Sequence, residues 1–352
     1  MASRLIKIGA IATAAGSSVY YLNNNQWDVK NIGILRFGRA VKTVAWIAVD
    51  YKLSLRNYKD NSPESLEMWS TVHTRSAEKL LNLCCVNGGV FIKVGQHIAA
   101  MEYMVPIEYA TTLKVLHSRA PLSTLNKVKQ VIKEDLGSDA DQLFDDFNEK
   151  PIGAASLAQV HKAKLKDGKV VAVKVQHPNV KKHAFVDMTT MECLVRIVDK
   201  IFPEFSFNFL VEETKRNLPL ELDFVNEGKN AERLARSFFK FPWLKIPEIF
   251  WDLSSTRVLT MEFVEGGEVT DKNYMIKNGI SCREVSQRLT TLYSEMIFIN
   301  GNVHSDPHPG NILVRKSKYG AEIVLLDHGL YAVRKKKLNQ CNETLLTFWF
   351  SN

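Results

Sequence analysis

Between Ser65 and Met104, apolar residues recur at three- and four-residue steps, which is the pattern of amphipathic helices. Gly88-Gly89 interrupts the pattern, so we expect two helices. The stripe expected to face the core in the second helix consists of Phe91, Val94, Ile98 and Met101. Lys93 and Gln96 lie on another face, and Gly95 between them predicts a closely packed neighbour, because glycine is costly inside a helix. A solvated lysine and glutamine are the ordinary alternative.

A second helical pattern begins at Ser281. Ser281 and Glu284 have the spacing of a capping box, and Asn300-Gly301 ends the pattern. Its apolar residues follow one another at steps of four and three: Val285, Leu289, Leu292, Met296 and Ile299. We therefore expect one amphipathic helix from Ser281 to Asn300.

Apolar runs of strand length occupy the middle of the chain. A strand over Val160–Leu165, a turn at Asp167-Gly168 and a buried strand over Val170–Val175 predict a hairpin. Ile246–Ile249 and Arg257–Phe263 are expected to pair with each other as two further strands. The buried strand of the hairpin contains a lysine, Lys174, whose charge is costly there unless an acidic partner lies nearby.

Three acidic residues within two helical turns are candidates for that partner: Glu221, Asp223 and Glu227. Asp223 and Glu227 are four residues apart, and like charges at this spacing repel each other on a helix. We therefore expect cations or a metal ion to face them. Exposed surface acidity is the alternative interpretation.

Composition and charge set broad limits. The 352 residues are 45% hydrophobic and 24% charged, which is typical of a globular chain with one large or two medium domains. The net charge of +8 is spread along the chain without an aromatic-interleaved basic stripe, so no nucleic-acid partner is expected. A basic surface facing acidic phospholipids accounts for the charge better. The five cysteines have no regular spacing, which indicates idle thiols in a reducing compartment.

The segment 1–27 has the composition of a targeting sequence. It contains Arg4 and Lys7 but no acidic residue before Asp28, and an apolar run of small residues lies between Ile8 and Leu22. This run is short for a bilayer span, which needs about 20 apolar residues. A mitochondrial presequence fits better than a secretory signal, because the chain has no disulfide framework. We therefore expect mitochondrial localisation, with a weak membrane anchor as the alternative.

The stretch from Val303 to Val314 carries the main candidate chemistry. Asp306, four intervening residues, Asn311, a short hairpin and then Asp327-His328-Gly329 have the spacing of a protein-kinase catalytic loop and metal-binding turn. In such a site one carboxylate orients the acceptor, while an amide and a second carboxylate hold the metal ions that bridge the phosphates.

A nucleotide-binding segment precedes these residues. Gly153–Val160 has the spacing of a phosphate-binding glycine loop with alanine at the second and third glycine positions, and Val171–Lys174 provides the strand lysine. Met261–Gly267 resembles a kinase hinge. The expected nucleotide-binding residues are Ile152, Gly153, Ala154, Ala155, Ser156, Leu157, Ala158, Gln159, Val160, Lys174, Met261 and Phe263. The sequence contains no G-x4-G-K-[S/T], which excludes a P-loop.

Five motifs, in order, resemble the UbiB-type atypical kinases, also called aarF domain-containing kinases. These motifs are Lys93-x-Gly95-Gln96, the alanine-rich Ala154–His161, Val171-Ala172-Val173-Lys174, Glu221-x-Asp223 and Asp306-Pro307-His308-Pro309-Gly310-Asn311. The resemblance covers about residues 30–332 and implies an α+β, protein-kinase-like two-lobe fold with an N-terminal helical extension. It also implies ATP or ADP with Mg²⁺ as cofactors.

The resemblance implies a role for each matching residue. Lys174 would contact the phosphates and pair with Glu227, Asp306 would be the catalytic acid or base, and Asn311 and Asp327 would bind magnesium. Lys93 would pair with Glu221 in the extension over the substrate cleft, with Gln96 and Asp223 as the other family-specific residues. The alanine-rich loop replaces the usual glycine loop.

The expected domains are a targeting or weak anchor segment at 1–27, the helical extension at 28–150, the kinase-like N-lobe at 151–264 and a partial C-lobe at 265–352. A kinase C-lobe normally adds several helices after the metal-binding turn, so we expect a truncated or alternatively spliced form with a divergent tail. The helix over Ser281–Asn300 would then lack packing partners for much of its apolar stripe.

Three functions remain open at this point. The first is an atypical kinase or ATPase in mitochondrial lipid or membrane homeostasis, with membrane lipids or membrane proteins as partners and an unknown substrate. The second is a catalytically impaired pseudokinase or scaffold. In the third, His304, Asp306, His308 and His328 form a metal site of a hydrolase or oxygenase. Pro307 and Pro309 argue against the helix that such a site needs, so histidines that orient the loop are favoured.

Overall fold

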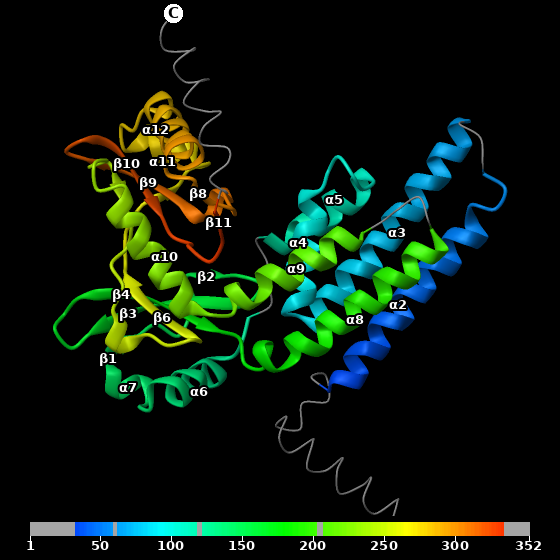
Figure 1. The fold of residues 1–352 in the computed structure, drawn as a ribbon, viewed down its shortest axis with the longest axis horizontal. Helices are drawn as coiled ribbons and strands as arrows, with labels where there is room; N and C mark the ends of the chain where they lie inside the picture. Colours follow the sequence, from blue (N-terminus) through cyan, green and yellow to red (C-terminus); the bar gives the residue numbers. More distant parts are fainter. Residues whose placement is uncertain (1–31, 59–61, 118–121, 203–206, 334–352) are drawn as a thin grey trace, which may run out of the picture. The chain divides into compact units, whose positions relative to one another are not determined.

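The computed structural model describes residues 32–58, 62–117, 122–202 and 207–333, which fall into two units (Figure 1). Within these ranges, the first unit comprises the residues up to Ser123 together with Ala154–Ala158 and His177–Lys215. The second unit comprises Thr124–Gly153, Gln159–Gln176 and the residues from Arg216 onward. The expected targeting segment 1–27 and the tail from residue 334 lie outside the described residues.

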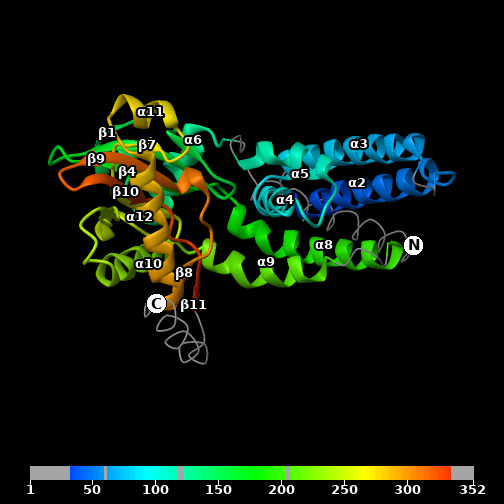
Figure 2. The same cartoon turned by 90° about the horizontal axis from the view of Figure 1, so that it is seen from above.

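The first unit is helical. Its elements are α2 (Gly33–Ser54), α3 (Pro63–Asn87), α4 (Val90–Ala100), α5 (Ile107–Leu113), the 3-10 helix η2 (Lys114–His117), α8 (Val180–Ile201) and the first part of α9 (Asn208–Glu221). Figure 2 shows α2 and α3 lying alongside each other. None of the helices in the described ranges has the length and apolarity that a bilayer span requires.

A buried ion pair holds three helices of this unit together. Arg36 on α2 donates from Nε to Asp187 Oδ1 on α8 at 2.8 Å, and its Nη1 donates to the carbonyl oxygen of Asn87 at the end of α3. Arg36 and Asp187 are 2% and 1% exposed. Because both charges are buried and paired, loss of either one would leave the other uncompensated.

The break at Gly88-Gly89 is confirmed. Ser62 caps the start of α3 by accepting a hydrogen bond from Ser65 N, and Gly88 ends the helix at a φ of 68°. A positive φ favours glycine, because a Cβ atom would be strained there. The close approach at Gly95 on α4 is also confirmed, since a Cβ atom there would lie 2.4 Å from Leu116 Cδ1 and 3.1 Å from Cys84 Sγ.

The expected core stripe of α4 is only partly right. Phe91 is buried, but Val94, Ile98 and Met101 are half-buried. The buried face is rotated toward Gly95 and includes Ile92 and Ala99, because Gly95 is the position where neighbouring side chains approach the helix most closely.

The second unit begins with α6 (Leu125–Leu136) and α7 (Ala140–Leu143), and it contains the sheets of the described residues except for Ala154 and Ala158 at strand ends. Its first sheet has the order β1-β3-β4-β6, with β2 paired to β3. The strands are β1 (Phe144–Phe147), β2 (Gly153–Ala154), β3 (Ala158–Leu165), β4 (Val170–Gln176) and β6 (Val258–Glu262). The expected β3–β4 hairpin is present, with Gly168 at a φ of 88° in its turn.

One expected strand is absent. Residues Ile246–Ile249 form no strand, and only Ile249 makes an isolated bridge to Met261. Pro247 interrupts the run and cannot donate a hydrogen bond to a ladder. The 3-10 helix η3 (Trp251–Leu253) then leads into β6.

The second sheet has the order β5-β10-β9-β7, in which β5 is parallel to β10 and the other pairs are antiparallel. Its strands are β5 (Leu244–Lys245), β7 (Gly267–Glu268), β9 (Ile312–Ser317) and β10 (Gly320–Leu325). Three helical elements accompany it: α10 (Phe224–Ser237), α11 (Lys272–Lys277) and α12 (Cys282–Ser294). A short third sheet pairs β8 (Asn302–His304) with β11 (Tyr331–Val333).

The expected helix over Ser281–Asn300 changes character near its end. Ser281 caps α12 by accepting from Glu284 N, but after Ser294 the turns widen into a π-helix over Glu295–Asn300, which Gly301 ends at a φ of 66°. The expectation that its apolar stripe lacks partners is wrong for most of α12. Val285, Leu292 and Met296 are buried in one core with β9 and β10, and the exposed apolar residues are Ile297, Phe298 and Ile299.

These elements make a mixed helix-and-sheet structure, as the sequence predicts for its α+β class. Four of the cysteines are free thiols, and Cys341 lies outside the described residues. Burial raises the pKa of the Cys84 thiol to about 12. This thiol is therefore inert, which agrees with the interpretation of idle cysteines.

Candidate functional site

Lys174 lies on β4 in the second unit, and its side chain is buried. It is opposite Leu259 of β6 in the antiparallel ladder and is 9% exposed. Its Nζ donates to both carboxylate oxygens of Glu227, at 2.6 and 2.8 Å, and to Asp327 Oδ2 at 3.2 Å. The expected acidic partner of the strand lysine is therefore Glu227, and a second acid joins it.

Glu227 is brought to Lys174 by the first turn of α10. Asp223 caps this helix by accepting from Val225 N at 3.1 Å, so its carboxylate satisfies a free helix-end donor. Phe224, the first residue of α10, places its ring centroid 5.1 Å from Lys174 Nζ. Glu227 itself is 3% exposed. The repulsion expected between Asp223 and Glu227 is thus relieved by a cap on one side and a cation on the other.

The electrostatics keep the lysine charged. Burial by itself lowers the pKa of Lys174, but Asp327 and Glu227 outweigh it and hold the pKa above its ordinary value. For Glu227, burial outweighs the opposing effect of Lys174 and raises the pKa to about 7. One buried ammonium group shared by two carboxylates can bind and orient an anionic ligand.

The loop from Asp306 to Asn311 follows β8 and contains the 3-10 helix η5 (Pro309–Asn311). His308 accepts from Gly310 N through Nδ1 at 3.1 Å, which fixes the turn. The carbonyl oxygen of Asn311 accepts from Leu326 N at 3.0 Å. Because Leu326 precedes Asp327, this bond brings the two expected magnesium ligands, Asn311 and Asp327, to the same end of the β9–β10 hairpin.

The Asp327 turn is held by hydrogen bonds from Gly329 and His304. Gly329 N donates to Asp327 Oδ1 at 2.9 Å, and His304 Nε2 donates to the Asp327 carbonyl oxygen at 2.5 Å. The other nitrogen of His304 accepts from Asp306 N at 3.3 Å. A single histidine ring therefore joins the expected catalytic residue to the expected metal ligand.

His328 is buried beneath this turn. Burial, with a contribution from His304, lowers its pKa to about 4, so the ring is neutral at physiological pH. Its Nε2 donates to the Leu325 carbonyl oxygen at 3.2 Å, and Nδ1 accepts from the Tyr331 hydroxyl at 2.8 Å. His304 and His308 thus make the loop hydrogen bonds that the interpretation of orienting histidines predicts, whereas His328 bonds to Leu325 and Tyr331. Within the described ranges, no group of three or more His, Cys, Asp or Glu residues could hold a metal ion.

Asn230 belongs to the site, although the sequence analysis missed it. It lies three residues after Glu227 on the same face of α10, is 7% exposed, and donates from Nδ2 to the His328 carbonyl oxygen at 3.1 Å. The three-residue spacing from Glu227 is the signal that could have identified it. Asn230 ties α10, which carries Glu227, to the turn that carries Asp327.

The alanine-rich loop differs from the expectation in one respect. The strand β3 begins at Ala158 rather than Val160, and Leu157, Ala158 and Gln159 are 5%, 1% and 1% exposed. Within the first unit, His177 N donates to the Leu157 carbonyl oxygen at 2.9 Å. Because those three side chains are buried, the part of this segment that a ligand could reach is mainly backbone.

The remaining expected residues are distributed over both units. Met261 lies on β6, and Phe263 follows the strand with its ring 4.3 Å from Lys162 Nζ. Gln96 on α4 donates from Nε2 to the Leu116 carbonyl oxygen at 2.9 Å. Lys93 is 9% exposed, and this burial contradicts the alternative of a solvated lysine. Lys93 belongs to the first unit and Glu221 to the second, and their pairing stays a prediction.

The site also fits a magnesium ion in its chemistry. Asn311 and Asp327 offer an amide and a carboxylate, which are oxygen donors of the kind that Mg²⁺ prefers. Asp327 Oδ2 lies beside the Lys174 ammonium group and Oδ1 beside Gly329 N. A cation at this carboxylate would therefore share it with Lys174.

Comparison with known proteins supplies the family. Residues 115–351 match the family described as the ABC1 atypical kinase-like domain. The AarF domain-containing protein kinase 1 of Gallus gallus is 55% identical over 95% of this chain and 64% of its own length. The protein of the same name from Mus musculus is 53% identical over 99% of this chain and 68% of its own length. The chain thus spans about two thirds of these relatives.

A solved structure is also similar. It is the complex of Rv3197 with erythromycin from Mycobacterium tuberculosis, with 28% sequence identity and a TM-score of 0.49. The match covers 76% of this chain and 67% of that chain.

Proposed function

Because the chain belongs to the ABC1 atypical kinase-like domain family, we propose that it binds ATP or ADP with magnesium and acts as an atypical kinase or ATPase. The observation that carries the proposal is the buried Lys174 ammonium group, which bonds to Glu227 of α10 and to Asp327 of the turn after β10. A charged lysine between two acids from different elements is the arrangement by which kinases orient nucleotide phosphates.

We propose the following roles for the residues of the second unit. Lys174 binds phosphate oxygens while Glu227 fixes its position, and backbone groups at Met261 and Phe263 meet the adenine. Asn311 and Asp327 hold magnesium, which supplies charge neutralisation on the phosphates when it is bound. Asp306 orients the hydroxyl group of the acceptor, or a water molecule, and takes its proton. That the backbone of the alanine-rich loop over Gly153–Val160 provides donors to the phosphates stays a prediction from the sequence.

A nucleotide-dependent melting experiment tests this proposal. We expect ATP or ADP with magnesium to raise the melting temperature, because a ligand that binds only the folded state stabilises it. Lys174→Ala should abolish the ligand-induced shift, and Asp327→Asn, which preserves size, should remove its magnesium dependence. Lys169→Ala, an exposed lysine on the same hairpin, is the matched control. A full shift in Lys174→Ala would refute the site assignment.

One observation favours a second candidate, a nucleotide-binding pseudokinase or scaffold. Both carboxylate oxygens of Asp327 already have protein partners, Lys174 and Gly329 N, so the magnesium ligand is partly neutralised. ATP hydrolysis by the purified chain separates the two candidates. Turnover that is lost in Asp327→Asn supports the kinase or ATPase, whereas nucleotide binding without turnover supports the scaffold.

We also propose that the protein acts in the mitochondrion, in lipid or membrane homeostasis, with membrane lipids or membrane proteins as partners. The support is the composition of residues 1–27, which are basic and contain no acid, and the net charge of +8. Fluorescence imaging of the chain with a C-terminal tag checks the location. The fluorescence of the tag should colocalise with a mitochondrial dye, and this colocalisation should be lost when residues 1–27 are deleted. Unchanged colocalisation after the deletion would contradict the proposed presequence.

A further inference from the structure

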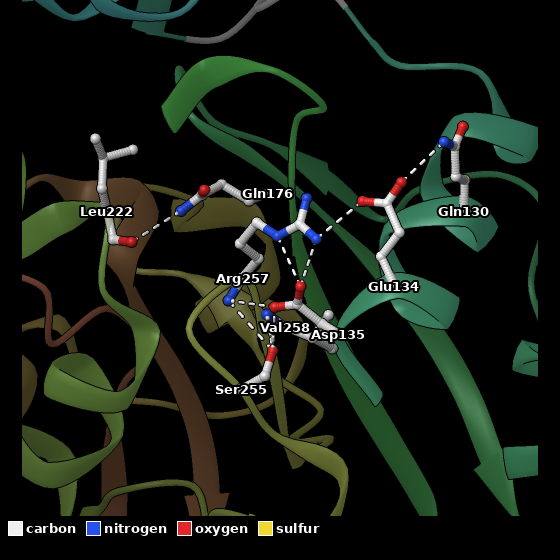
Figure 3. A network of polar contacts seen from close by, with 8 residues as sticks. All are labelled: Gln130, Glu134, Asp135, Gln176, Leu222, Ser255, Arg257 and Val258. Carbon is white, nitrogen blue, oxygen red and sulfur yellow. Dashed lines mark hydrogen bonds and ion pairs between the residues drawn. The ribbon is translucent and has the colours of Figure 1, made fainter. Parts of the chain in front are cut away.

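A polar network lies around Arg257, at the turn that precedes β6 (Figure 3). Its guanidinium group donates from Nε to Asp135 Oδ1 at 2.7 Å, and its Nη2 bonds to the same carboxylate and to Glu134 Oε2. The other oxygen of Asp135 accepts from Ser255 Oγ at 2.7 Å and from Arg257 N at 3.2 Å. The carboxylate of one α6 residue therefore holds both the side chain and the backbone of this turn.

Burial and charge show that Asp135, rather than its neighbour Glu134, makes the ordered contact. The side chains of Asp135 and Arg257 are 12% and 21% exposed, whereas that of Glu134 is 44% exposed. Burial raises the pKa of Asp135, but the hydrogen bonds from Arg257 and Ser255 outweigh it and hold the pKa below its ordinary value. The pair is therefore fully charged at neutral pH, and the Nε and Nη2 groups of Arg257 both donate to the same oxygen, Asp135 Oδ1.

The same turn bonds to the two elements that carry the candidate site. The carbonyl oxygen of Thr256 accepts from Phe224 N, the first residue of α10, at 3.1 Å. The carbonyl oxygen of Arg257 accepts from Gln176 N, the last residue of β4, at 2.9 Å. Gln176 also donates from Nε2 to the Leu222 carbonyl oxygen at 3.3 Å, just before α10 (Figure 3).

These two elements meet at Lys174. Lys174 lies two residues before Gln176 on β4, and Glu227 lies three residues after Phe224 on α10. The Phe224 ring contacts the Lys174 ammonium group directly, with 5.1 Å between Nζ and the ring centroid. A shift of the 255–257 turn would therefore move Phe224 and Glu227 relative to Lys174.

We infer that Asp135 and Arg257 are positioning residues, which hold the turn so that α10 presents Phe224 and Glu227 to Lys174. The expected effect on nucleotide binding rests on the proposed function. The expected effect on the position of Lys174 does not depend on it. Positioning groups outside the site are effective because a displacement of about 1 Å can cost a site much of its function.

The first test follows Lys174 without any nucleotide. The purified chain is treated with an amine-acylating reagent, and the labelling rate of Lys174 is measured by peptide mass spectrometry relative to the exposed Lys169. Asp135→Asn should raise this ratio on the order of tenfold, because loosening of the ion pair frees the amine. Glu134→Gln, which changes the neighbouring acid bound to the same arginine, is the matched control and should leave the ratio unchanged.

The second test measures the affinity for ATP with magnesium. Asp135→Asn should weaken binding on the order of tenfold, and Arg257→Lys, which preserves charge but cannot donate to both Asp135 and Glu134 in the same planar geometry, should weaken it less. Arg257→Lys also serves both tests if Asp135→Asn fails to fold.

The outcomes separate the inference from the proposed function. Unchanged Lys174 labelling in a folded Asp135→Asn chain overturns the inference, whether or not nucleotide binds. Increased labelling in a chain whose wild type binds no nucleotide supports the positioning role and refutes the proposed function. An equal increase in Glu134→Gln also overturns the inference, because it would indicate general loosening of α6.

Discussion

At the scale of single residues, the candidate site depends on charges that are buried together. An apolar strand that contains Lys174 requires an acidic partner, and this requirement is visible in the sequence. The residue pattern alone could not choose among Glu221, Asp223 and Glu227, because the choice depends on where α10 begins. The structure makes Asp223 the helix cap and Glu227 the partner of Lys174.

Substitution of Lys174 tests how much the Lys174–Glu227 ion pair contributes to the free energy of unfolding. Lys174→Met should lower the free energy of unfolding by about 3–5 kcal/mol, because it leaves the buried Glu227 carboxylate unpaired. Urea unfolding at neutral pH measures the change. Adding Glu227→Gln to the variant should recover part of the loss, whereas the exposed Lys169→Met should change stability by less than about 0.5 kcal/mol. A Lys174→Met chain as stable as the wild type would show that the pair contributes nothing.

At the scale of elements, the face of a helix that becomes buried depends on where neighbouring side chains approach it most closely. In α4, the apolar stripe predicted one face, but the glycine at position 95 moved the buried face toward Leu116 and Cys84. In α12, the spacing of apolar residues correctly identified the core contacts but could not show the π-helix that follows Ser294. Hydrophobic periodicity reports amphipathicity, whereas the exact face depends on what packs against it.

Two glycine-to-alanine substitutions in the helical unit should have opposite effects. Gly38→Ala on α2 should raise the free energy of unfolding by up to about 1 kcal/mol, because the helix gains propensity and the added Cβ atom meets open space. Gly95→Ala should lower it by about 1–3 kcal/mol, because its Cβ atom would overlap the buried Leu116 side chain. Urea unfolding monitored by circular dichroism compares them. Equal effects would mean that Leu116 and Cys84 move aside freely.

The link between α6 and the β6 turn should be sensitive to acid. Because the folded-state pKa of Asp135 lies below its ordinary value, its ion pair stabilises the fold fully above the unfolded-state pKa. This stabilisation is lost as the pH falls through the folded-state pKa. The difference in unfolding free energy between the wild type and Asp135→Asn should therefore be largest at neutral pH and shrink on acidification. A difference that is constant with pH would rule out the titration of Asp135 as its source.

At the scale of the whole molecule, net charge and composition bear on partners rather than on fold. The net charge of +8 predicts attraction to anionic surfaces, and it is consistent with the proposed membrane partner. Which residues make that surface does not follow from the charge alone.

Vesicle binding checks this expectation. The chain should cosediment with vesicles that contain anionic phospholipid at low salt, since each basic residue near such a surface contributes about 1 kcal/mol. Binding should fall steeply as added salt screens the charges, and neutral phosphatidylcholine vesicles should bind little. Equal binding to both kinds of vesicle, unaffected by salt, would point to apolar insertion instead.

The sequence by itself determined most of the local elements and which residues are candidates for the chemistry. Helix breaks at Gly88 and Gly301, the hairpin turn at Gly168 and the cap at Ser281 follow from local backbone preferences, so they could be predicted. The Asp306, Asn311 and Asp327 motif also fixed the β9–β10 hairpin between its members.

Only the tertiary structure decided how distant residues meet. Asn230 reaches the His328 carbonyl oxygen across 98 positions, and Asp135 reaches Arg257 across 122. Helical spacing places Asn230 on the face of Glu227, but the sequence does not show which distant group either residue bonds, because a hydrogen bond constrains two atoms rather than the pattern around them. The strand predicted at Ile246–Ile249 is absent for a related reason. A strand needs hydrogen bonds to a neighbouring strand, and Pro247 has no N–H group to donate one. Local preference sets the elements, and packing selects which of their polar groups become partners.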